Sequence, residues 1–394
     1  MNELAYVLVN PYTVSKSRTG GVISRLLSRS SQLNLIGARM FAPSPELVTE
    51  YTDVLTAGLS SAPDRREIEE LLIEYVRAHY MPDSDGRRRR VMFLLVEGDN
   101  AVAHLREQVV GSIIRQTVGE TIRDTYGDYI VDEQGNVVYF EPAVLIGRTP
   151  EEARRHIDIW VRHSDNDSGV LYDAVAYPPD TQVEHTFVMI KPDTFGQSRT
   201  RPGTVIDLFA KTGLCIIAAK ILHMTVAQAM EFYGPVREVF YERFRGRVRE
   251  RVITALENAF ECPLPVDGVE GLVEELRRPF ADYEFGRIVQ FITGSNPWEI
   301  PREEWDAPGK ETCLALVYQG DRAVRRIREQ LGSTDPSKAA LTTVRKEFGQ
   351  DVMVNAAHAS DSCENAAREI AIVDMQSNDL AALLARHDEQ GSAR

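Results

Sequence analysis

The chain has 394 residues, about two to three times the length of a typical domain of ~150 residues, so two globular units are expected. Hydrophobic residues make up 43% and charged residues 26% of it, with 26 Gly and 19 Pro, which excludes a collagen-like or wholly disordered chain. The formal net charge of −14 disfavours nucleic acid as a partner. Small anionic ligands remain open, because a few arginines can dominate one cleft.

The four cysteines are scattered along the chain. Cys215, Cys262, Cys313 and Cys363 form no C-x-x-C pair and have no histidine-rich spacing, which predicts neither a zinc site nor a disulfide framework. Scattered reduced thiols are typical of the cytoplasm, which is the location we expect. The apolar run Leu4–Val9 is too short for a signal peptide, and no run reaches about twenty apolar residues, so no membrane contact is expected.

Several blocks of the sequence occur twice along the chain, in the same order each time. YVLVNPY at Tyr6–Tyr12 returns as FVMIKPD at Phe187–Asp193. Each block is followed by the same tripeptide, Ser-Arg-Thr, at 17–19 and 198–200. A longer block, VMFLLVEGDNAVAHLREQVVG at 91–111, returns as CLALVYQGDRAVRRIREQLG at 313–332. Several ordered repeats predict an internal duplication.

A connector separates the two copies. Residues 164–182, SDNDSGVLYDAVAYPPDTQ, are rich in the Ser, Asp, Gly and Pro that are typical of loops. We therefore predict a first domain at 1–163, a linker at 164–182 and a second domain at 183–394. The second domain has an insertion at about 243–310, and the first has a shorter one that ends in Arg87–Arg90.

The second copy predicts alternating strands and helices. Strands are expected at 185–190, 214–223, 312–318 and 351–354, and helices at 203–211, 225–233, 321–331 and 362–370. This order is the split βαβ plan, so the predicted fold class is α+β, with two tandem ferredoxin-like (βαββαβ) domains that each carry an insertion. A further helix is expected inside the second insertion, at 266–278.

The block Asn355–Ser362, followed by Glu369, resembles the active-site block N-x-x-H-G-S-D-S of nucleoside diphosphate kinases. Other landmarks of that family occur in order: Lys191 in MIKPD, Tyr233 in EFY, Arg328 and Thr334 in R-x-x-x-G-x-T-x-P, and Arg345 in T-x-x-R-x-x-F-G. The resemblance covers about residues 184–375 apart from the insertion. Two departures are Ala359, where the family has Gly, and Leu341–Thr343, where it has P-G-T.

The resemblance implies a chemical role for each matching residue. A neutral imidazole is a nucleophile available at pH 7, and His358 is expected to carry the phosphoryl group. Glu369 is expected to hold the other ring nitrogen, and Ser360, Lys191 and Tyr233 also belong to the expected catalytic set. The expected nucleotide-binding residues are Tyr233, Arg328, Thr334 and Arg345 around the phosphates, Lys191 and Asn355 on the ribose with Lys191 also near the phosphates, and Tyr241 (or Phe240) with Val352 on the base. Mg²⁺ is expected on the nucleotide, held by phosphates and waters without a protein metal site.

Some of these residues also have a purely structural interpretation. Arg328 lies in a basic stretch and is also compatible with a helix-face charge, Lys191 with an ordinary strand end, and Glu369 with a solvated helix residue. The alternating arginines from Arg243 to Arg251, and Arg87–Arg90, are interpreted as solvated charges.

The first copy lacks the key residues. Asn10 stands in place of Lys191, and the block aligned to His358 contains no histidine, with Val144 as the expected counterpart. Arg106 and Arg123 persist opposite Arg328 and Arg345. We therefore expect a catalytically inactive copy that forms a pseudo-dimer with the second copy inside one chain. Homo-oligomers are also compatible with the sequence.

The sequence predicts a nucleoside diphosphate kinase that transfers the γ-phosphate of an NTP to an NDP through a phosphohistidine at His358, by a Mg²⁺-dependent ping-pong mechanism. Two alternatives stay open. One is a nucleotide-binding regulatory or scaffold protein with weak catalysis, and the other is a phosphotransfer protein that uses His358 with a protein acceptor.

Overall fold

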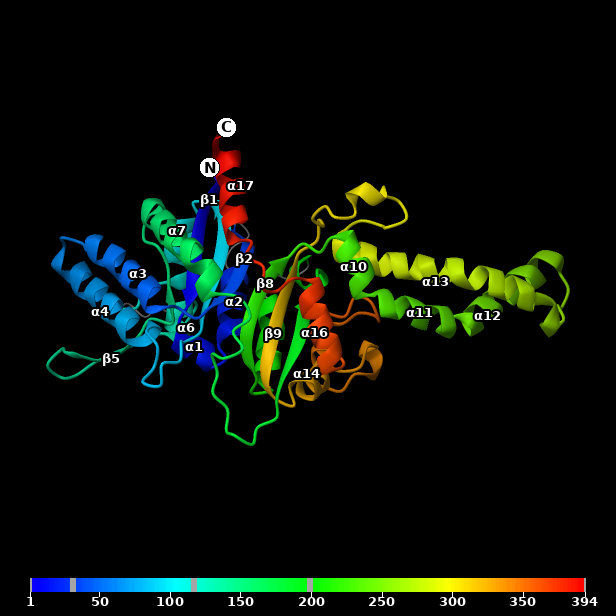
Figure 1. The fold of residues 1–394 in the computed structure, drawn as a ribbon, viewed down its shortest axis with the longest axis horizontal. Coiled ribbons are helices and arrows are strands. Elements are labelled where there is room, and N and C mark those ends of the chain that lie inside the picture. Colours follow the sequence, from blue (N-terminus) through cyan, green and yellow to red (C-terminus); the bar gives the residue numbers. More distant parts are fainter. Residues whose placement is uncertain (1, 29–32, 115–118, 197–200, 393–394) are drawn as a thin grey trace. The chain divides into compact units, whose positions relative to one another are not determined.

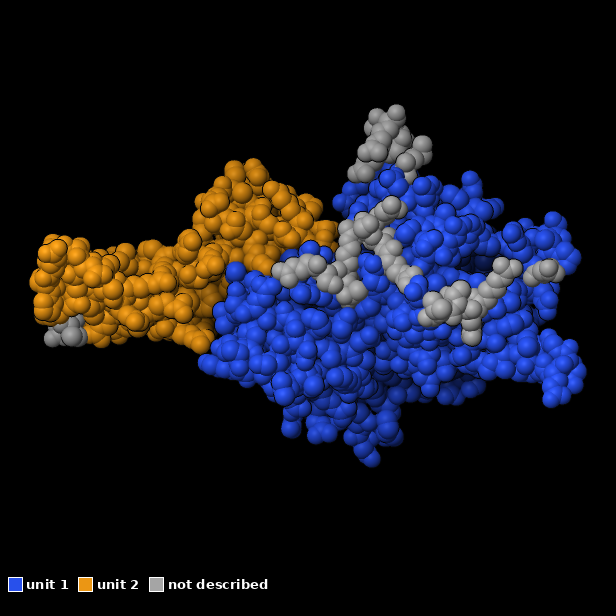
Figure 2. Space-filling model, turned by 180° about the vertical axis from the view of Figure 1, so that it is seen from behind, with its two compact units in different colours: residues 1–221, 314–394 blue, residues 222–313 orange. Residues whose placement is uncertain are grey.

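The computed structural model describes residues 2–28, 33–114, 119–196 and 201–392 (Figure 1). The chain divides into two compact units, residues 1–221 with 314–394 and residues 222–313 (Figure 2). Both predicted copies of the fold contribute to the first unit, and the second unit is an excursion from the second copy. The boundaries predicted at 163 and 183 stay predictions. Helix α7 (Pro150–Asp167) extends into the predicted linker.

Two four-stranded antiparallel sheets form the centre of the first unit. One contains β1 (Asn2–Val9), β2 (Leu33–Phe41), β3 (Val91–Asp99) and β6 (Val144–Leu145), in the order β2-β3-β1-β6. The other contains β7 (Val183–Ile190), β8 (Cys215–Leu222), β9 (Cys313–Asp321) and β10 (Ala357–Ala359), in the order β8-β9-β7-β10. When the strands of each sheet are numbered along the chain, both orders read 2-3-1-4. The predicted fold of two tandem ferredoxin-like domains is therefore confirmed.

Helices pack on both sheets in the same pattern. Helices α5 (Ala101–His104) and α7 pack against β1, and α14 (Ala323–Leu331) and α16 (Cys363–Ile372) pack against β7. The remaining elements of this unit are α1 (Pro11–Ser15), α2 (Thr19–Ser28), α3 (Pro45–Ala57), α4 (Pro63–Tyr80), α6 (Ile122–Tyr126), the hairpin β4 (Asp128–Val131) and β5 (Val137–Glu141), α8 (Asp193–Gly196), α9 (Arg201–Ala210), α15 (Val344–Phe348) and α17 (Leu380–Ser392). A 3₁₀ turn spans Pro336–Lys338. The repeated tripeptide at 198–200 lies outside the described residues.

The two copies match in backbone detail. Asn100 and Arg322, which precede α5 and α14, have left-handed φ angles of 50° and 49°. The first copy then has one more residue than the second before the glycine that ends the helix. A π-helix at Leu105–Val110 accommodates that residue, because a π-turn holds one more residue than an α-turn.

One predicted strand is misplaced. Residues 351–354 form no strand, because the Asp351 carboxylate accepts hydrogen bonds from Met353 N and Val354 N, both at 2.7 Å, and so bends the backbone. The fourth strand of the second sheet is instead Ala357–Ala359, where His358 lies opposite Met189 of β7.

Helices α2 and α9 join the two copies. Gly20 and Gly203 lie where these helices cross, and neither position has room for a side chain. A Cβ at Gly203 would lie 2.3 Å from Gly20 O and from Ser24 N, and a Cβ at Gly20 would lie 2.5 Å from Gly203 O. The close approach of the copies therefore depends on glycine at both positions.

We expect Gly203→Ala to lower the free energy of unfolding by about 2 kcal/mol, because the helices must separate to admit a methyl group. Urea denaturation followed by circular dichroism measures the change. Gly246→Ala is the matched control, since a Cβ there meets nothing within 4 Å and alanine favours helix. Equal stability of Gly203→Ala and the wild type would contradict the close contact.

The second unit is helical and contains the whole of the predicted insertion. Its helices are α10 (Val226–Phe232), α11 (Gly234–Arg243), α12 (Arg245–Phe260) and α13 (Glu270–Thr293), with 3₁₀ turns at Val266–Val269 and Arg302–Glu304. Helices α12 and α13 pack around a small core of Val248, Val252, Val269 and Val273. The predicted helix at 266–278 is therefore present but continues to Thr293. Among the described residues, no helix has the length and apolar character needed to cross a membrane.

Candidate active site

His358 lies on β10 and is held by a carboxylate. Its Nε2 is 3.0 Å from Glu369 Oε1, and Ser360 Oγ donates to Glu369 Oε2 at 2.5 Å. The Glu369 side chain is 5% exposed and that of His358 22%. Because an ionised carboxylate only accepts hydrogen bonds, Nε2 carries the proton of a neutral ring and the lone pair lies on Nδ1. The lone pair of the neutral ring is therefore on the nitrogen that Glu369 does not contact.

Two local features place these groups. Helix α16, which carries Glu369, begins after Ser362, whose hydroxyl accepts a hydrogen bond from Asn365 N at 3.0 Å. Ala359 lies in extended β10 opposite Val188, so the backbone after the histidine has a conformation open to any residue. The replacement of the family's glycine at this position therefore imposes no strain on the backbone.

A second cluster joins three more of the predicted residues. Lys191 Nζ donates to Asn355 Oδ1 at 2.7 Å and to Met353 O at 3.1 Å. Asn355 Nδ2 donates to Thr334 O at 3.2 Å. Lys191 and Asn355 are buried, with exposed fractions of 8% and 1%. A lysine and an amide on the same buried network hold each other in fixed positions.

Arg345 is built into the backbone around this cluster. Its guanidinium donates to Gly332 O and Ala357 O, each at 3.2 Å, and to Thr334 Oγ1 at 3.3 Å. In the first copy, Arg123 donates to Gly111 O and Val144 O, also at 3.2 Å. Because the same two contacts occur where the histidine is lacking, they are a feature of the fold. A phosphate-binding role of Arg345 stays a prediction.

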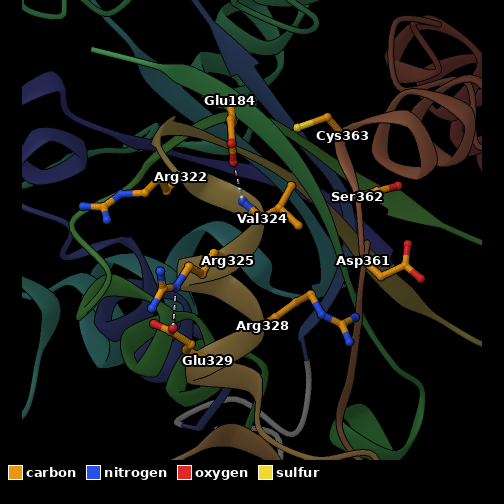
Figure 3. A pocket seen from close by; sticks show the side chains of 9 residues that line it. All are labelled: Glu184, Arg322, Val324, Arg325, Arg328, Glu329, Asp361, Ser362 and Cys363. Atoms are coloured by element: carbon orange, nitrogen blue, oxygen red, sulfur yellow. Dashed lines mark hydrogen bonds and ion pairs between the residues drawn. The ribbon is translucent and has the colours of Figure 1, made fainter. Parts of the chain in front are cut away.

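Arg328 lines an open cavity of about 590 Å³ beside α14 and the start of α16. Figure 3 shows its side chain extending from α14 toward the segment that carries Asp361. The hydrogen bond from Asn365 holds the pKa of Asp361 below its ordinary value, and the charge of Arg328 acts in the same direction, as does His358 when its ring is protonated. Arg328 and His358 therefore share one acidic neighbour.

Val352, predicted to contact a base, is 62% exposed.

The two predicted tyrosines belong to the second unit. Tyr233 is 7% exposed and ends α10, where its N–H bonds to Ala229 O at 3.0 Å. The Tyr241 ring lies 3.9 Å from the Arg277 guanidinium and 5.6 Å from that of Arg278. Phe240, the alternative to Tyr241, packs on Phe244. Base stacking on either ring stays a prediction.

The strand register shows which residue of the first copy stands in the place of His358. In the second copy Ile190 pairs with Ala357 and Met189 with His358, and in the first copy Val9 pairs with Val144 and Leu8 with Leu145. The repeated motif equates Met189 with Leu8. The counterpart of His358 is therefore Leu145, and the prediction of Val144 is wrong by one residue. The two blocks have too few identical residues to fix their alignment.

The first copy fills the corresponding place with its own side chains. Tyr80 OH donates to Asn10 Oδ1 at 2.7 Å, Asn10 Nδ2 donates to Glu141 Oε1 at 3.2 Å, and Tyr75 OH donates to Glu141 Oε2 at 2.6 Å. Each of these residues is at most 4% exposed. The residue that replaces Lys191 is therefore enclosed by tyrosines of α4 in a buried network.

This network predicts a pH effect. Burial raises the pKa of Glu141, although hydrogen bonds from Tyr75 and Asn10 oppose the shift. The ionised carboxylate is thus less favourable in the folded chain than in the unfolded one, and stability falls as pH rises from the unfolded to the folded pKa. We expect Glu141→Gln to gain stability relative to the wild type as the pH rises above 4.5, the ordinary pKa of a glutamate, measured by urea denaturation. A difference that does not change with pH would contradict this.

Two acids inside the quoted motifs were given no role by sequence reasoning. Asp361 lies in the S-D-S part of the histidine block and Asp193 in MIKPD. The signal for both was their position within two residues of a predicted site residue, Lys191 for Asp193 and Ser360 for Asp361. Their function could not be read from spacing, because spacing does not show which backbone or side chain a carboxylate faces.

Comparisons with known proteins show which family the second copy is similar to. The family model for nucleoside diphosphate kinase matches residues 184–258 and 308–378. The chain is 33% identical to a nucleoside diphosphate kinase of Bdellovibrio bacteriovorus over 190 residues, which are 48% of this chain and 92% of that protein. It is 30% identical to one from Chlamydia muridarum, covering 48% and 90%. A crystal structure of the Aquifex aeolicus nucleoside diphosphate kinase is similar at 27% identity and a TM-score of 0.30, covering 48% and 94%.

Proposed function

Because the chain belongs to the nucleoside diphosphate kinase family, we propose that it transfers the γ-phosphate of an NTP to an NDP through a phosphohistidine at His358. The observation that carries the proposal is the imidazole on β10, with Nε2 held by Glu369 and Glu369 held in turn by Ser360. A histidine oriented by a carboxylate is the arrangement that nucleophilic catalysis requires.

The transfer runs in two balanced steps. Nδ1 of His358 attacks the γ-phosphorus of the NTP, the bond from that phosphorus to the β,γ-bridging oxygen breaks, and the NDP leaves with the electron pair. The positive charge that develops on the ring is stabilised by Glu369. An acceptor NDP then attacks the phosphohistidine through a β-phosphate oxygen, and the P–N bond breaks to regenerate the neutral ring.

Cations around the histidine support this chemistry. Charge spreads over the equatorial oxygens during phosphoryl transfer, so positive side chains lower the barrier. Lys191, Arg328 and Arg345 supply such charges within the first unit. We assign Lys191 and Asn355 to the nucleotide because they form one buried pair next to β10. Tyr233, Thr334, Tyr241 and Val352 complete the proposed set.

We propose that Mg²⁺ enters with the nucleotide. The described residues contain no group of three or more His, Cys, Asp or Glu side chains able to hold a metal ion, and an ion bound by phosphate oxygens and waters does not need one. When bound, Mg²⁺ neutralises phosphate charge. Asp361, which lines the same cavity as Arg328, is the residue that we assign to the waters around the ion.

We also infer that the first copy serves as the partner in an intramolecular pseudo-dimer. Its counterpart of the site is filled by Tyr75, Tyr80 and Glu141, and it joins the second copy through α2 and α9. Because the first copy has this interface and lacks the histidine, its proposed role is to stabilise the fold of the second copy and not to take part in the reaction.

Labelling tests the proposal. The protein is incubated with Mg²⁺ and γ-labelled ATP, the acid-labile label is measured, and GDP or dCDP is then added. We expect about one label per chain, removed by either diphosphate. No label on the wild type would refute both phosphohistidine functions. Label that diphosphates cannot remove would refute the kinase and favour a protein acceptor.

A further inference from the structure

A strained turn lies between two of the proposed site residues. Ala356, between Asn355 and the strand that carries His358, has a φ of 68°. Ala357 N donates to Asn355 O at 2.8 Å, so the turn closes over a single residue. Such a turn is rare, and a side chain with a Cβ is unfavourable in this left-handed region. Strain of this kind persists only where neighbouring groups fix it.

Both polar backbone groups of Ala356 are fixed by the segment after β7. Ala356 N donates to Asp193 Oδ2 at 3.0 Å, and Ala356 O accepts from Lys191 N at 2.9 Å. Burial raises the pKa of Asp193, and the hydrogen bond from Ala356 N and the charge of Lys191 oppose the shift. The turn therefore depends on one half-buried carboxylate.

The first copy repeats the turn with a carboxylate from a different place in the chain. Ala143 has a φ of 59°, and Val144 N donates to Pro142 O at 2.6 Å. Ala143 N donates to Glu141 Oε1 at 2.9 Å, and Ala143 O accepts from Asn10 N at 3.1 Å. In both copies a carboxylate oxygen thus accepts a hydrogen bond from the N–H of the strained alanine, although the two carboxylates come from unrelated positions in the chain. A carboxylate at this point is what the turn requires, and only in the second copy does the turn lead to a histidine.

We propose that Asp193 is a positioning residue for phosphoryl transfer, which holds the Ala356 turn so that Asn355 and His358 keep their relative placement. This inference rests on the proposed function. Asp193 itself need not touch the nucleotide, because it acts through the backbone of Ala356.

The test compares three variants in steady-state phosphoryl transfer from ATP to an NDP. We expect Asp193→Ala to lower kcat about 10²-fold with a KM change of less than about threefold, since a displacement near 1 Å of a reacting group has an effect of that size. Asp193→Asn keeps an oxygen that accepts from Ala356 N and should stay within about fivefold of the wild type. Asp193→Ala combined with Ala356→Gly should recover at least about tenfold, because glycine adopts the turn without a Cβ.

Glu141→Ala is the matched control, since it removes the carboxylate that accepts the equivalent hydrogen bond in the turn of the first copy. Its folded fraction should transfer phosphate at the wild-type rate. Wild-type kcat in Asp193→Ala would overturn the proposal, and so would equal losses in Asp193→Ala and Glu141→Ala after correction for the folded fraction.

Nuclear magnetic resonance of the His358 ring separates this inference from the proposed function, because it does not depend on turnover. We expect Asp193→Ala to shift the ring signals and Glu141→Ala to leave them in place. Unchanged ring signals in Asp193→Ala would overturn the positioning role even in an active enzyme. Shifted signals in a protein that never becomes labelled would leave the positioning of the ring supported and refute only the kinase.

Discussion

His358→Ala is expected to abolish phosphoryl transfer, with a fall in kcat on the order of 10⁴-fold or more, because no second nucleophile takes its place. The acid-labile label should disappear at the same time. Nucleotide binding, followed by the change in a fluorescent ADP analogue, should remain measurable, since the proposed phosphate and ribose contacts come from other residues. Persistent labelling of the variant would show that another group is the nucleophile.

His163→Ala is the matched control for this variant. His163 forms a similar pair with a carboxylate, with Nε2 at 2.8 Å from Glu50 Oε2, and its side chain is 20% exposed against 22% for His358. It lies on α7, which packs against β1 of the first sheet. We expect full labelling in this variant, which would show that a partly buried histidine beside a glutamate is not sufficient for labelling.

Lys191→Asn gives the second copy the residue that the first copy has. We expect it to lower kcat/KM by about 10²-fold, because a positive donor is lost from the phosphates and Asn355 loses its 2.7 Å partner. Transfer kinetics with ATP and GDP measure the change. Activity within twofold of the wild type would favour the interpretation of Lys191 as an ordinary strand end.

The control for Lys191→Asn is Lys220→Asn. Lys220 is also a lysine with 8% exposure, and its Nζ donates to Asp374 O at 2.8 Å and to Ser377 Oγ at 2.7 Å. The loss of these bonds should lower the melting temperature and leave the kcat/KM of the folded protein unchanged. The two variants together separate the loss of a buried lysine from the loss of a substrate contact.

The sequence predicted the duplicated fold because repeated blocks set strand order in both copies at once. The resemblance also predicted that Glu369 accompanies His358, and that Lys191 and Asn355 belong to one site although 164 positions separate them in the chain. The fourth strand was misplaced because Asp351 folds back on its own backbone, a local effect that apolar patterning does not register. Leu145 was missed because two divergent blocks were aligned without strand pairing.

Other features had no sequence signal. The buried network of Asn10, Tyr75, Tyr80 and Glu141 joins residues from separate elements and depends on where α4 packs. The turn at Ala356 is likewise invisible, because alanine does not indicate a left-handed backbone. The two tyrosines of the second unit were identified from short motifs, and spacing alone cannot say what their rings face.

The crossing of α2 and α9 has a consequence for how this protein responds to dilution. In an assembly of separate subunits, the corresponding contact weakens as protein concentration falls, and the melting temperature falls with it. Here both helices belong to one chain, so neither copy can diffuse away from the other. Activity per molecule and melting temperature should therefore be the same at nanomolar and micromolar protein.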